Sequence, residues 1–326
     1  MTKKYLSASI LSCICMTVTG CGAGASNAVV SPAESIGKEV ISADASAEYT
    51  TPEASTEDAS LVPIDEWEEN WKEIMGDGEE VEADFDESEY DEDIVKSKVD
   101  EVIKNSKSIA EEIEGIEKIA NYYTGYHFDG DLGQQGMNVV SGAEPYTWEL
   151  ELDSLLKRAL EEADASKKEE IQVEQKKWKA DFDRCFDTLK YEEGSWAPMQ
   201  NSTLDARFLK NRCYMLAKTL SDIKGDNYEL PKRYFMDNAY VSDSGMLDIS
   251  EGMEGGSIAI TVVVDGKEVG QLAYDPLIND TTIDFKAQSG IEGKITYGWD
   301  GATLSITKSV NKIIPKGTEL KFPTAM

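Results

Sequence analysis

The sequence predicts an α+β protein of several domains, with helices first and strands last. Apolar residues recur at helical spacing as far as Gly225, and from Met246 onward they alternate with polar residues at the spacing of strands. Asp265-Gly266 in the second part is a strong hairpin turn signal. We therefore expect antiparallel helices followed by a small antiparallel β barrel or sandwich.

The first 20 residues have the features of a lipoprotein signal peptide. Lys3-Lys4 precede an apolar run from Tyr5 to Val18, and Val18-Thr19-Gly20-Cys21 has the small residues of a lipobox. The run is shorter than the ~20 apolar residues that a bilayer span requires. The pattern predicts cleavage before Cys21 and acylation of its thiol, with palmitate among the chains. The expected location is the extracellular face of the cytoplasmic membrane.

Residues 21–63 and 64–126 are expected to form an acidic tether and an acidic helical segment. The tether is rich in Ala, Ser, Thr and Glu and has no sustained apolar period, which is typical of disorder. Ile64–Met75 has the apolar spacing of a short helix, and Ile94–Ala120 has a longer apolar stripe that predicts one helix. The carboxylates between these helices lack the turn glycine of a calcium loop, so no metal site is predicted.

The charge of the chain is strongly negative. It carries 63 acidic and 32 basic residues, a net charge of −31, and loss of Lys3 and Lys4 leaves 30 basic residues and −33. Residues 227–326 hold 14 acidic and 9 basic residues, which is only −5. Such a surface repels nucleic acid and attracts cationic partners. Solubility outside the cell is the alternative reason for the charge.

Three further helices are predicted between residues 146 and 220. They span Tyr146–Leu160, the stretch that ends at Leu189, and Asn201–Leu220, where Ser202 or Thr203 is expected to cap the first turn. The chain has a single histidine, His127, which does not favour histidine-based catalysis. Together with the absence of a distinctive carboxylate pair, this indicates no enzyme, and no cofactor is predicted.

Cys185 and Cys213 are the two thiols left after processing and acylation. Each lies 14 positions from residue 199, in the turn between two predicted helices, so a hairpin would bring them to similar heights. A disulfide between them and two separately buried thiols both stay open.

The C-terminal part contains seven predicted strands, and two-residue turns are predicted at Asp265-Gly266 and Asp300-Gly301. The strands are Met246–Ser250, Ser257–Val264, Val269–Asp275, Thr282–Ala287, Gly293–Trp299, Ala302–Thr307 and Glu319–Phe322.

Five blocks between Gln134 and Leu216 carry a family resemblance. They are Gln134–Asn138, Trp148–Leu156, Gln175–Trp178, Glu193-Gly194-Ser195 with Pro198, and Arg207–Arg212 with Tyr214 and Leu216. In this order they resemble the lysozyme-inhibitor-like domains of the LprI type, which implies a helical domain over residues 127–226 that binds lysozyme. Phe182-Asp183 stands where the family commonly has Arg-Asp. Glu151, Asp153 and Asp183 are the candidate partner-binding residues.

The strand-rich residues 227–326 resemble small lipocalin-like domains found in lipoproteins of anaerobic Gram-positive bacteria. The resemblance rests on Gly245–Ser250 and Gly293–Thr307. A barrel of this size could hold an apolar ligand, although side chains are expected to fill it.

The sequence as a whole predicts a lipid-anchored cell-surface binding protein that inhibits lysozyme through its acidic helical domain. The alternative is an envelope scaffold or ligand-binding lipoprotein with no lysozyme activity. The expected partners are the membrane, reached through the lipid, and a basic lysozyme or a cell-wall component. The sequence does not identify the partner, the oligomeric state or a ligand of the β domain.

Overall fold

The computed structural model describes residues 91–126, 133–232, 238–252, 256–279 and 281–326. All of these belong to one compact unit, Glu80–Met326. The predicted signal peptide with Cys21, the tether, the helix at Ile64–Met75 and His127 lie outside the described residues. None of the helices in the described part is long and apolar enough to cross a membrane.

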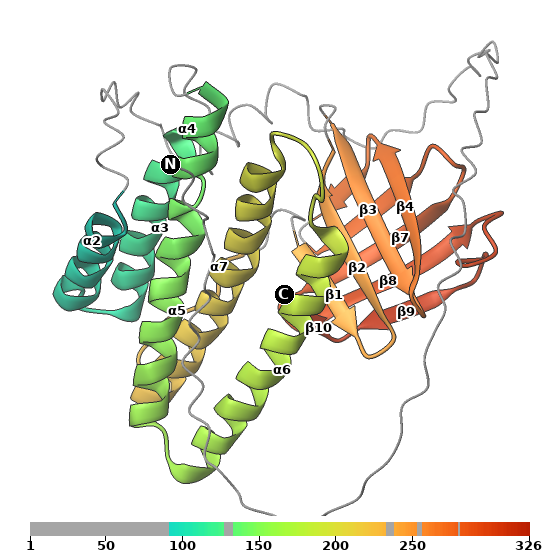
Figure 1. Cartoon of the computed structure of the whole chain (residues 1–326). Helices are drawn as coiled ribbons and strands as arrows, with labels where there is room; N and C mark the ends of the chain where they lie inside the picture. Colours follow the sequence, from blue (N-terminus) through green and yellow to red (C-terminus); the bar gives the residue numbers. More distant parts are fainter. Residues whose placement is uncertain (1–90, 127–132, 233–237, 253–255, 280) are drawn as a thin grey trace, which may run out of the picture. The chain divides into compact units, whose positions relative to one another are not determined.

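The helical part precedes the strands, as the apolar spacing predicts (Figure 1). Its elements are α2 (Glu92–Asn105), α3 (Ile109–Tyr126), α4 (Gly133–Val140), α5 (Ala143–Glu162), α6 (Ala165–Leu189) and α7 (Ala197–Lys224). Asp164 caps α6, since its Oδ1 accepts from the backbone N–H of Lys167 at 2.8 Å. Gly225 ends α7 in the left-handed conformation, with φ 71°.

The predicted helix over Ile94–Ala120 is wrong, because the chain turns back on itself within it. The hydroxyl of Ser106 donates to Val102 O at the end of α2, and Ser108 Oγ accepts from the N–H of Glu111 at the start of α3. Gly115 lets the two helices approach closely, since a Cβ on it would lie 2.6 Å from Val102 Cγ1. The apolar stripe is continuous across the break because both helices bury it.

The first turn of α7 also differs from the expectation. The helix begins at Ala197, with Pro198 in its first turn, so Ser202 and Thr203 lie inside it and do not cap it. Asn201 instead fixes the preceding loop: its side chain accepts from the N–H of Tyr191 at 2.8 Å and donates to Tyr191 O at 3.0 Å.

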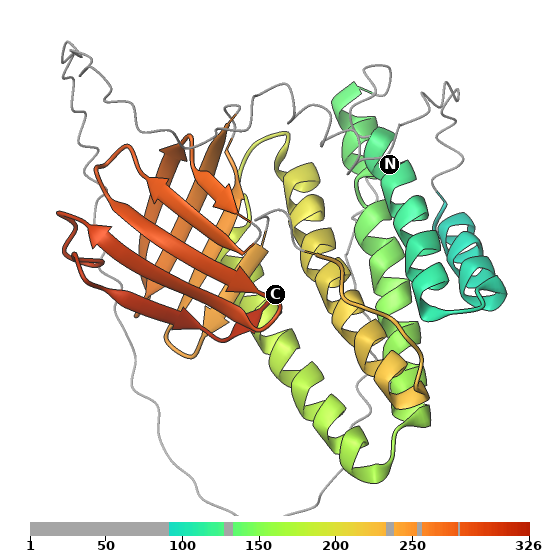
Figure 2. The ribbon, with the colours of Figure 1, turned by 180° about the vertical axis from the view of Figure 1, so that it is seen from behind.

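The strands form two five-stranded antiparallel sheets, seen from behind in Figure 2. The first sheet has the order β10-β1-β2-β3-β4 and the second has the order β5-β6-β7-β8-β9. Their elements are β1 (Asn238–Ser242), β2 (Gly245–Glu251), β3 (Ser257–Val264), β4 (Lys267–Tyr274), β5 (Leu277–Asn279), β6 (Thr282–Lys286), β7 (Glu292–Gly298), β8 (Gly301–Lys308), β9 (Glu319–Phe322) and β10 (Thr324–Ala325).

The seven predicted strands are confirmed, and so is the strongest predicted turn. Val264 pairs with Lys267, and both Asp265 and Gly266 have positive φ, 49° and 72°, as a type I′ turn requires. The pattern did not reveal β1, β5 and β10. The last two have three residues or fewer, and β1 buries four consecutive residues, so it shows no alternation.

The two sheets face each other over a hydrophobic core and do not close into a barrel within the described strands. Ile258, Ile260, Ile295 and Leu304 alternate inward from both sheets, and the interior is filled by such side chains. An isolated antiparallel bridge between Ala273 and Ala287 joins the sheets. The C-terminal part is therefore a sandwich-like pair of sheets.

A shared core connects the helices to the first sheet. Ala239, Val241, Met246 and Met326 belong to the same buried cluster as the inward residues of α5, α6 and α7. The predicted boundary between residues 226 and 227 thus falls at the end of α7, but residues on both sides of it belong to one hydrophobic core.

Polar contacts orient this interface. Arg207 Nη2 of α7 lies 2.8 Å from Asp248 Oδ1 of β2, and both side chains are nearly buried. Asn211, one turn later, donates to Asn238 Oδ1 at 3.1 Å and to Met326 O at 2.7 Å.

We predict that Arg207→Met destabilises the protein by roughly 3 kcal/mol, because Asp248 loses its ion pair with the Arg207 guanidinium in a nearly buried site. Urea unfolding followed by circular dichroism measures the change. Arg207→Met with Asp248→Asn should recover most of the loss. A loss below about 1 kcal/mol in the single variant would show that the pair does not stabilise the interface.

Candidate partner-binding surface

The candidate surface lies on α5, α6 and α7, where α6 diverges from the other two helices (Figure 1). Aromatic rings fill the space between α6 and α7. Phe182 lies 5.2 Å from Trp178, 6.1 Å from Phe186 and 5.8 Å from Phe208, measured between ring centroids. This aromatic packing stabilises α6, which has few other buried contacts. It also sets the positions of the charged residues on α6.

Four carboxylates from the three helices interact with one lysine or with one another, and we call them the acidic face. They are Glu149 and Asp153 of α5, Asp183 of α6 and Asp205 of α7. Glu149 and Asp153 are one turn apart and interact electrostatically. The lysine is Lys179, whose Nζ lies 2.9 Å from Asp183 Oδ1 and 4.5 Å from the centroid of the Phe182 ring.

The charges of the acidic face are only partly compensated. Burial, and next the charge of Glu149, raise the pKa of Asp205 to about 6 against the opposing effect of Lys179. Burial and the charge of Asp153 likewise raise the pKa of Glu149. Lys179 thus interacts with three of the four carboxylates, those of Glu149, Asp183 and Asp205. An approaching cation would lower the raised pKa values of Glu149 and Asp205.

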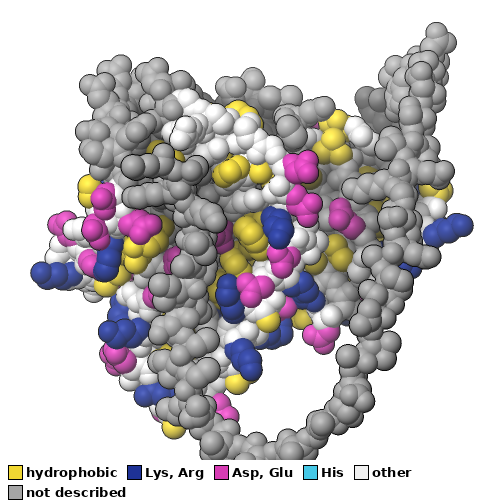
Figure 3. Space-filling view, viewed as in Figure 1, with side chains coloured by type: hydrophobic (Ala, Val, Ile, Leu, Met, Phe, Trp, Pro, Cys, Tyr) yellow, Lys and Arg dark blue, Asp and Glu magenta, His cyan; other side chains and the backbone are white. Residues whose placement is uncertain are grey.

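The space-filling view shows hydrophobic side chains reaching the surface of the helical part, with Asp, Glu, Lys and Arg side chains around them (Figure 3). An apolar area with a charged rim is the usual composition of a protein interface. Among the described residues, no group of three or more His, Cys, Asp or Glu is placed to hold a metal ion. The excess of carboxylates on the acidic face suits a cationic protein surface.

Two of the three predicted contact residues lie on the acidic face, and the third does not. Asp153 and Asp183 are exposed. Glu151 is 0% exposed, so the expectation that it meets a partner is corrected. The reason is helical spacing: Trp148, Leu152 and Leu155 are buried on α5, and position 151 falls within that inward stripe.

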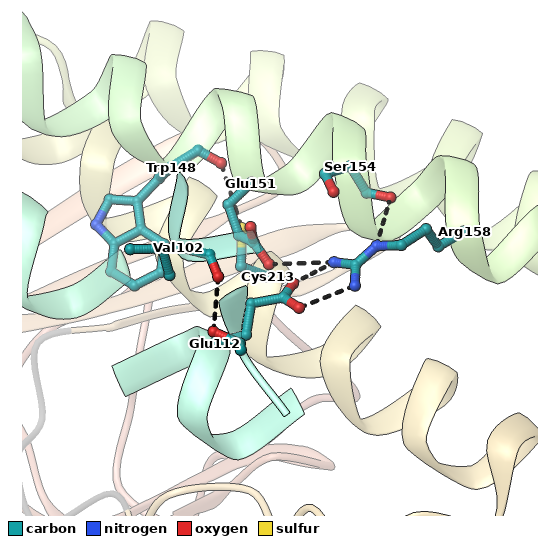
Figure 4. A network of polar contacts seen from close by, with 8 residues as sticks. Val102, Glu112, Trp148, Glu151, Ser154, Arg158 and Cys213 are labelled. Atoms are coloured by element: carbon teal, nitrogen blue, oxygen red, sulfur yellow. Dashed lines mark hydrogen bonds and ion pairs between the residues drawn. The ribbon is translucent and has the colours of Figure 1, made fainter. Parts of the chain in front are cut away.

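Glu151 belongs to a buried network beneath the surface (Figure 4). Arg158 Nη1 donates to Glu112 Oε2 of α3 at 2.9 Å, and Arg158 Nη2 binds the other oxygen of Glu112. The same Nη2 lies 3.7 Å from Glu151 Oε1. Both oxygens of Glu151 are buried without a hydrogen bond that meets the usual geometry.

Burial, and next the negative charge of Glu112, raise the pKa of Glu151 well above its ordinary value. One arginine interacts with two buried carboxyls, and the site favours the protonated form of Glu151. The bidentate pair of Arg158 and Glu112 ties α3 to α5.

Cys185 and Cys213 are free thiols in this structure, and the disulfide that the spacing allowed is not formed. They lie at different packing sites. Cys213 Sγ donates to Trp148 O of α5 at 3.3 Å, whereas charges of Arg184, Asp181 and Asp248 act on Cys185. Burial raises the pKa of Cys185 to about 12 and also raises that of Cys213, which makes both unreactive as thiolates.

A comparison with family models matches residues 129–216 to the family described as lysozyme inhibitor LprI. This confirms the resemblance that the five sequence blocks predict for the helical region. No curated protein and no solved structure was matched. The matched region contains the whole acidic face.

Sequence reasoning missed Glu149 and Asp205. Glu149 could have been found, because it is one helical turn before Asp153 and must share its face. Asp205 carried no such signal, since its approach to Glu149 depends on how α7 packs against α5.

We predict that Arg158→Met destabilises the protein by roughly 3–5 kcal/mol, because Glu112 becomes an unpaired buried charge. Lys157→Met, at an exposed neighbouring position, is the control and should change stability by less than about 0.5 kcal/mol.

Glu151→Gln should remove part of the pH dependence of stability. The pKa of Glu151 is higher in the folded than in the unfolded protein, so its contribution falls as pH rises above the unfolded value. The variant should therefore lose less stability than the natural protein as the pH rises from the ordinary pKa of 4.5 to neutral, as measured by urea unfolding. Identical profiles would exclude a protonated Glu151.

Proposed function

We propose that the helical region is a lysozyme-inhibitor-like module, which binds a basic lysozyme through the acidic face and blocks its action on the cell wall. The main support for this proposal is that two findings concern the same residues. The lysozyme inhibitor family model matches residues 129–216, and all four carboxylates of the acidic face lie within that range.

The charge of the whole chain supports the same partner. A net charge of −31 accelerates the encounter with a cationic protein, and salt reduces this long-range effect beyond a Debye length of ~8 Å. Non-specific attraction alone does not inhibit an enzyme. Specific binding requires short-range contacts, and the cluster of Glu149, Asp153, Asp183 and Asp205 offers them on one face.

The deciding measurement is inhibition of lysozyme-driven lysis of cell walls at physiological ionic strength. We expect Asp153→Asn, Asp183→Asn and Asp205→Asn together to weaken inhibition by at least about tenfold, since close charge pairs across an interface couple strongly. The matched control is Glu101→Gln, Glu162→Gln and Glu268→Gln, three exposed residues outside the acidic face. It changes the net charge equally and should keep inhibition within about twofold.

Unfolding would not explain a loss of inhibition in the first variant. The pKa of Asp205 is raised to about 6, so its ionised form costs stability above that pH. Asp205→Asn should therefore stabilise the protein at neutral pH. Equal loss in both triple variants, or no inhibition by the natural protein, would reject the lysozyme proposal in favour of an envelope scaffold.

We also propose that the protein is held on the cell surface by acylation of Cys21, a residue outside the described part. The support is the order of charged, apolar and small residues before it. Cys21→Ala should release the protein from the membrane fraction or leave it unprocessed, as detected by fractionation and mass spectrometry. Normal processing with full membrane retention would contradict the proposed lipidation.

A further inference from the structure

The loop between β8 and β9, residues 309–318, exposes two large apolar side chains. Val310 is 88% exposed and Ile313 is 37% exposed, whereas the next residue, Ile314, is buried in the core. Single exposed apolar residues are common on proteins. The conformation and charge of this loop distinguish it from such cases.

Hydrogen bonds within the loop hold Val310 and Ile313 outward. Asn311 Oδ1 accepts from the N–H groups of Ile313 and Ile314, at 2.7 and 3.3 Å. At the far end, the N–H of Gly317 donates to Ile306 O at 2.9 Å. Backbone groups that are bonded internally cost less to move out of water.

The loop is basic, although the protein is acidic. The loop and the adjoining strand ends, Lys308–Lys321, contain four lysines and one glutamate, a net charge of +3. Residues 1–226, in contrast, have a net charge of −26, which is the −31 of the whole chain without the −5 of residues 227–326. Lys312 and Lys316 are exposed, and among the described residues neither has an ion-pair partner. Lys308 is partly neutralised by Glu292 at 2.8 Å.

We infer that this loop docks on an anionic lipid surface, with Val310 and Ile313 at the boundary of the acyl chains and Lys312 and Lys316 on the headgroups. Exposed apolar side chains next to lysines are the combination that binds such surfaces. A soluble polyanion would engage the lysines but leave Val310 in water. The acidic remainder of the chain would be repelled, which orients the protein with this loop toward the bilayer.

The test places a fluorescent probe at the loop in the full chain. Val310→Trp is mixed with vesicles of phosphatidylglycerol and phosphatidylcholine that carry brominated acyl chains, which quench tryptophan on contact. The six natural tryptophans give a constant background that the natural protein measures. Val173→Trp is the matched control, since Val173 of α6 is 63% exposed and lies far along the chain from the loop.

We expect additional quenching for Val310→Trp on anionic vesicles and none for Val173→Trp. Lys312→Glu with Lys316→Glu should reduce the inserted fraction at least tenfold, because each lysine near an anionic bilayer contributes a factor of about five. Lys157→Glu with Lys176→Glu changes the net charge equally and should leave quenching unchanged.

Three outcomes would overturn the inference. The first is no greater quenching at position 310 than at position 173. The second is equal quenching on purely phosphatidylcholine vesicles. The third is an emission change with soluble poly(glycerol phosphate) but no quenching by brominated lipid, which would assign the loop to a wall polymer. None of these depends on lysozyme binding.

Discussion

The burial of α7 on more than one side is the constraint on which the rest of the structure depends. Phe208, Cys213 and Leu216 are buried within the helical part, while Arg207 and Asn211 contact β2 and the β1 and C-terminal segments. A helix that is buried on several sides cannot follow a simple amphipathic pattern. Its packing connects the helical part to the first sheet, and it carries Asp205 to the acidic face.

Charges in this protein are placed where they cost stability as well as where they stabilise it. Arg158 compensates Glu112, but Glu151 beside them is held without a full hydrogen-bond set. On the surface, Lys179 interacts with carboxylates of three helices. A buried network of this kind restricts the packing of α3 against α5. The surface carboxylates are only partly neutralised, so a cationic partner that binds them would gain favourable electrostatic energy.

The two proposed surfaces have opposite character and lie on different parts of the chain. The acidic face belongs to α5, α6 and α7, and the basic loop belongs to the second sheet. A protein held at a bilayer by its β8–β9 loop would keep its acidic face, which anionic lipid repels, available to a cationic enzyme. The two proposals are therefore compatible, although each rests on its own observations.

Local pattern determined the larger part of the secondary structure. Alternation predicts seven strands and Asp265-Gly266 predicts one of their two-residue turns, because strand period and turn geometry are properties of a few neighbouring residues. The five blocks from Gln134 to Leu216 likewise predict the family match. The break at Ser106 was missed, since an apolar stripe does not distinguish one long helix from two that share a core.

Only the tertiary structure decided which charged residues are accessible. Glu151 and Asp153 are two positions apart and equally acidic, yet one is buried beside Arg158 and the other is exposed. Asp205 meets Glu149 across two helices, and the thiols of Cys185 and Cys213 lie at different packing sites despite their matched spacing. The physical reason is that helix rotation is set by the sum of all packing contacts, which no short segment of sequence contains.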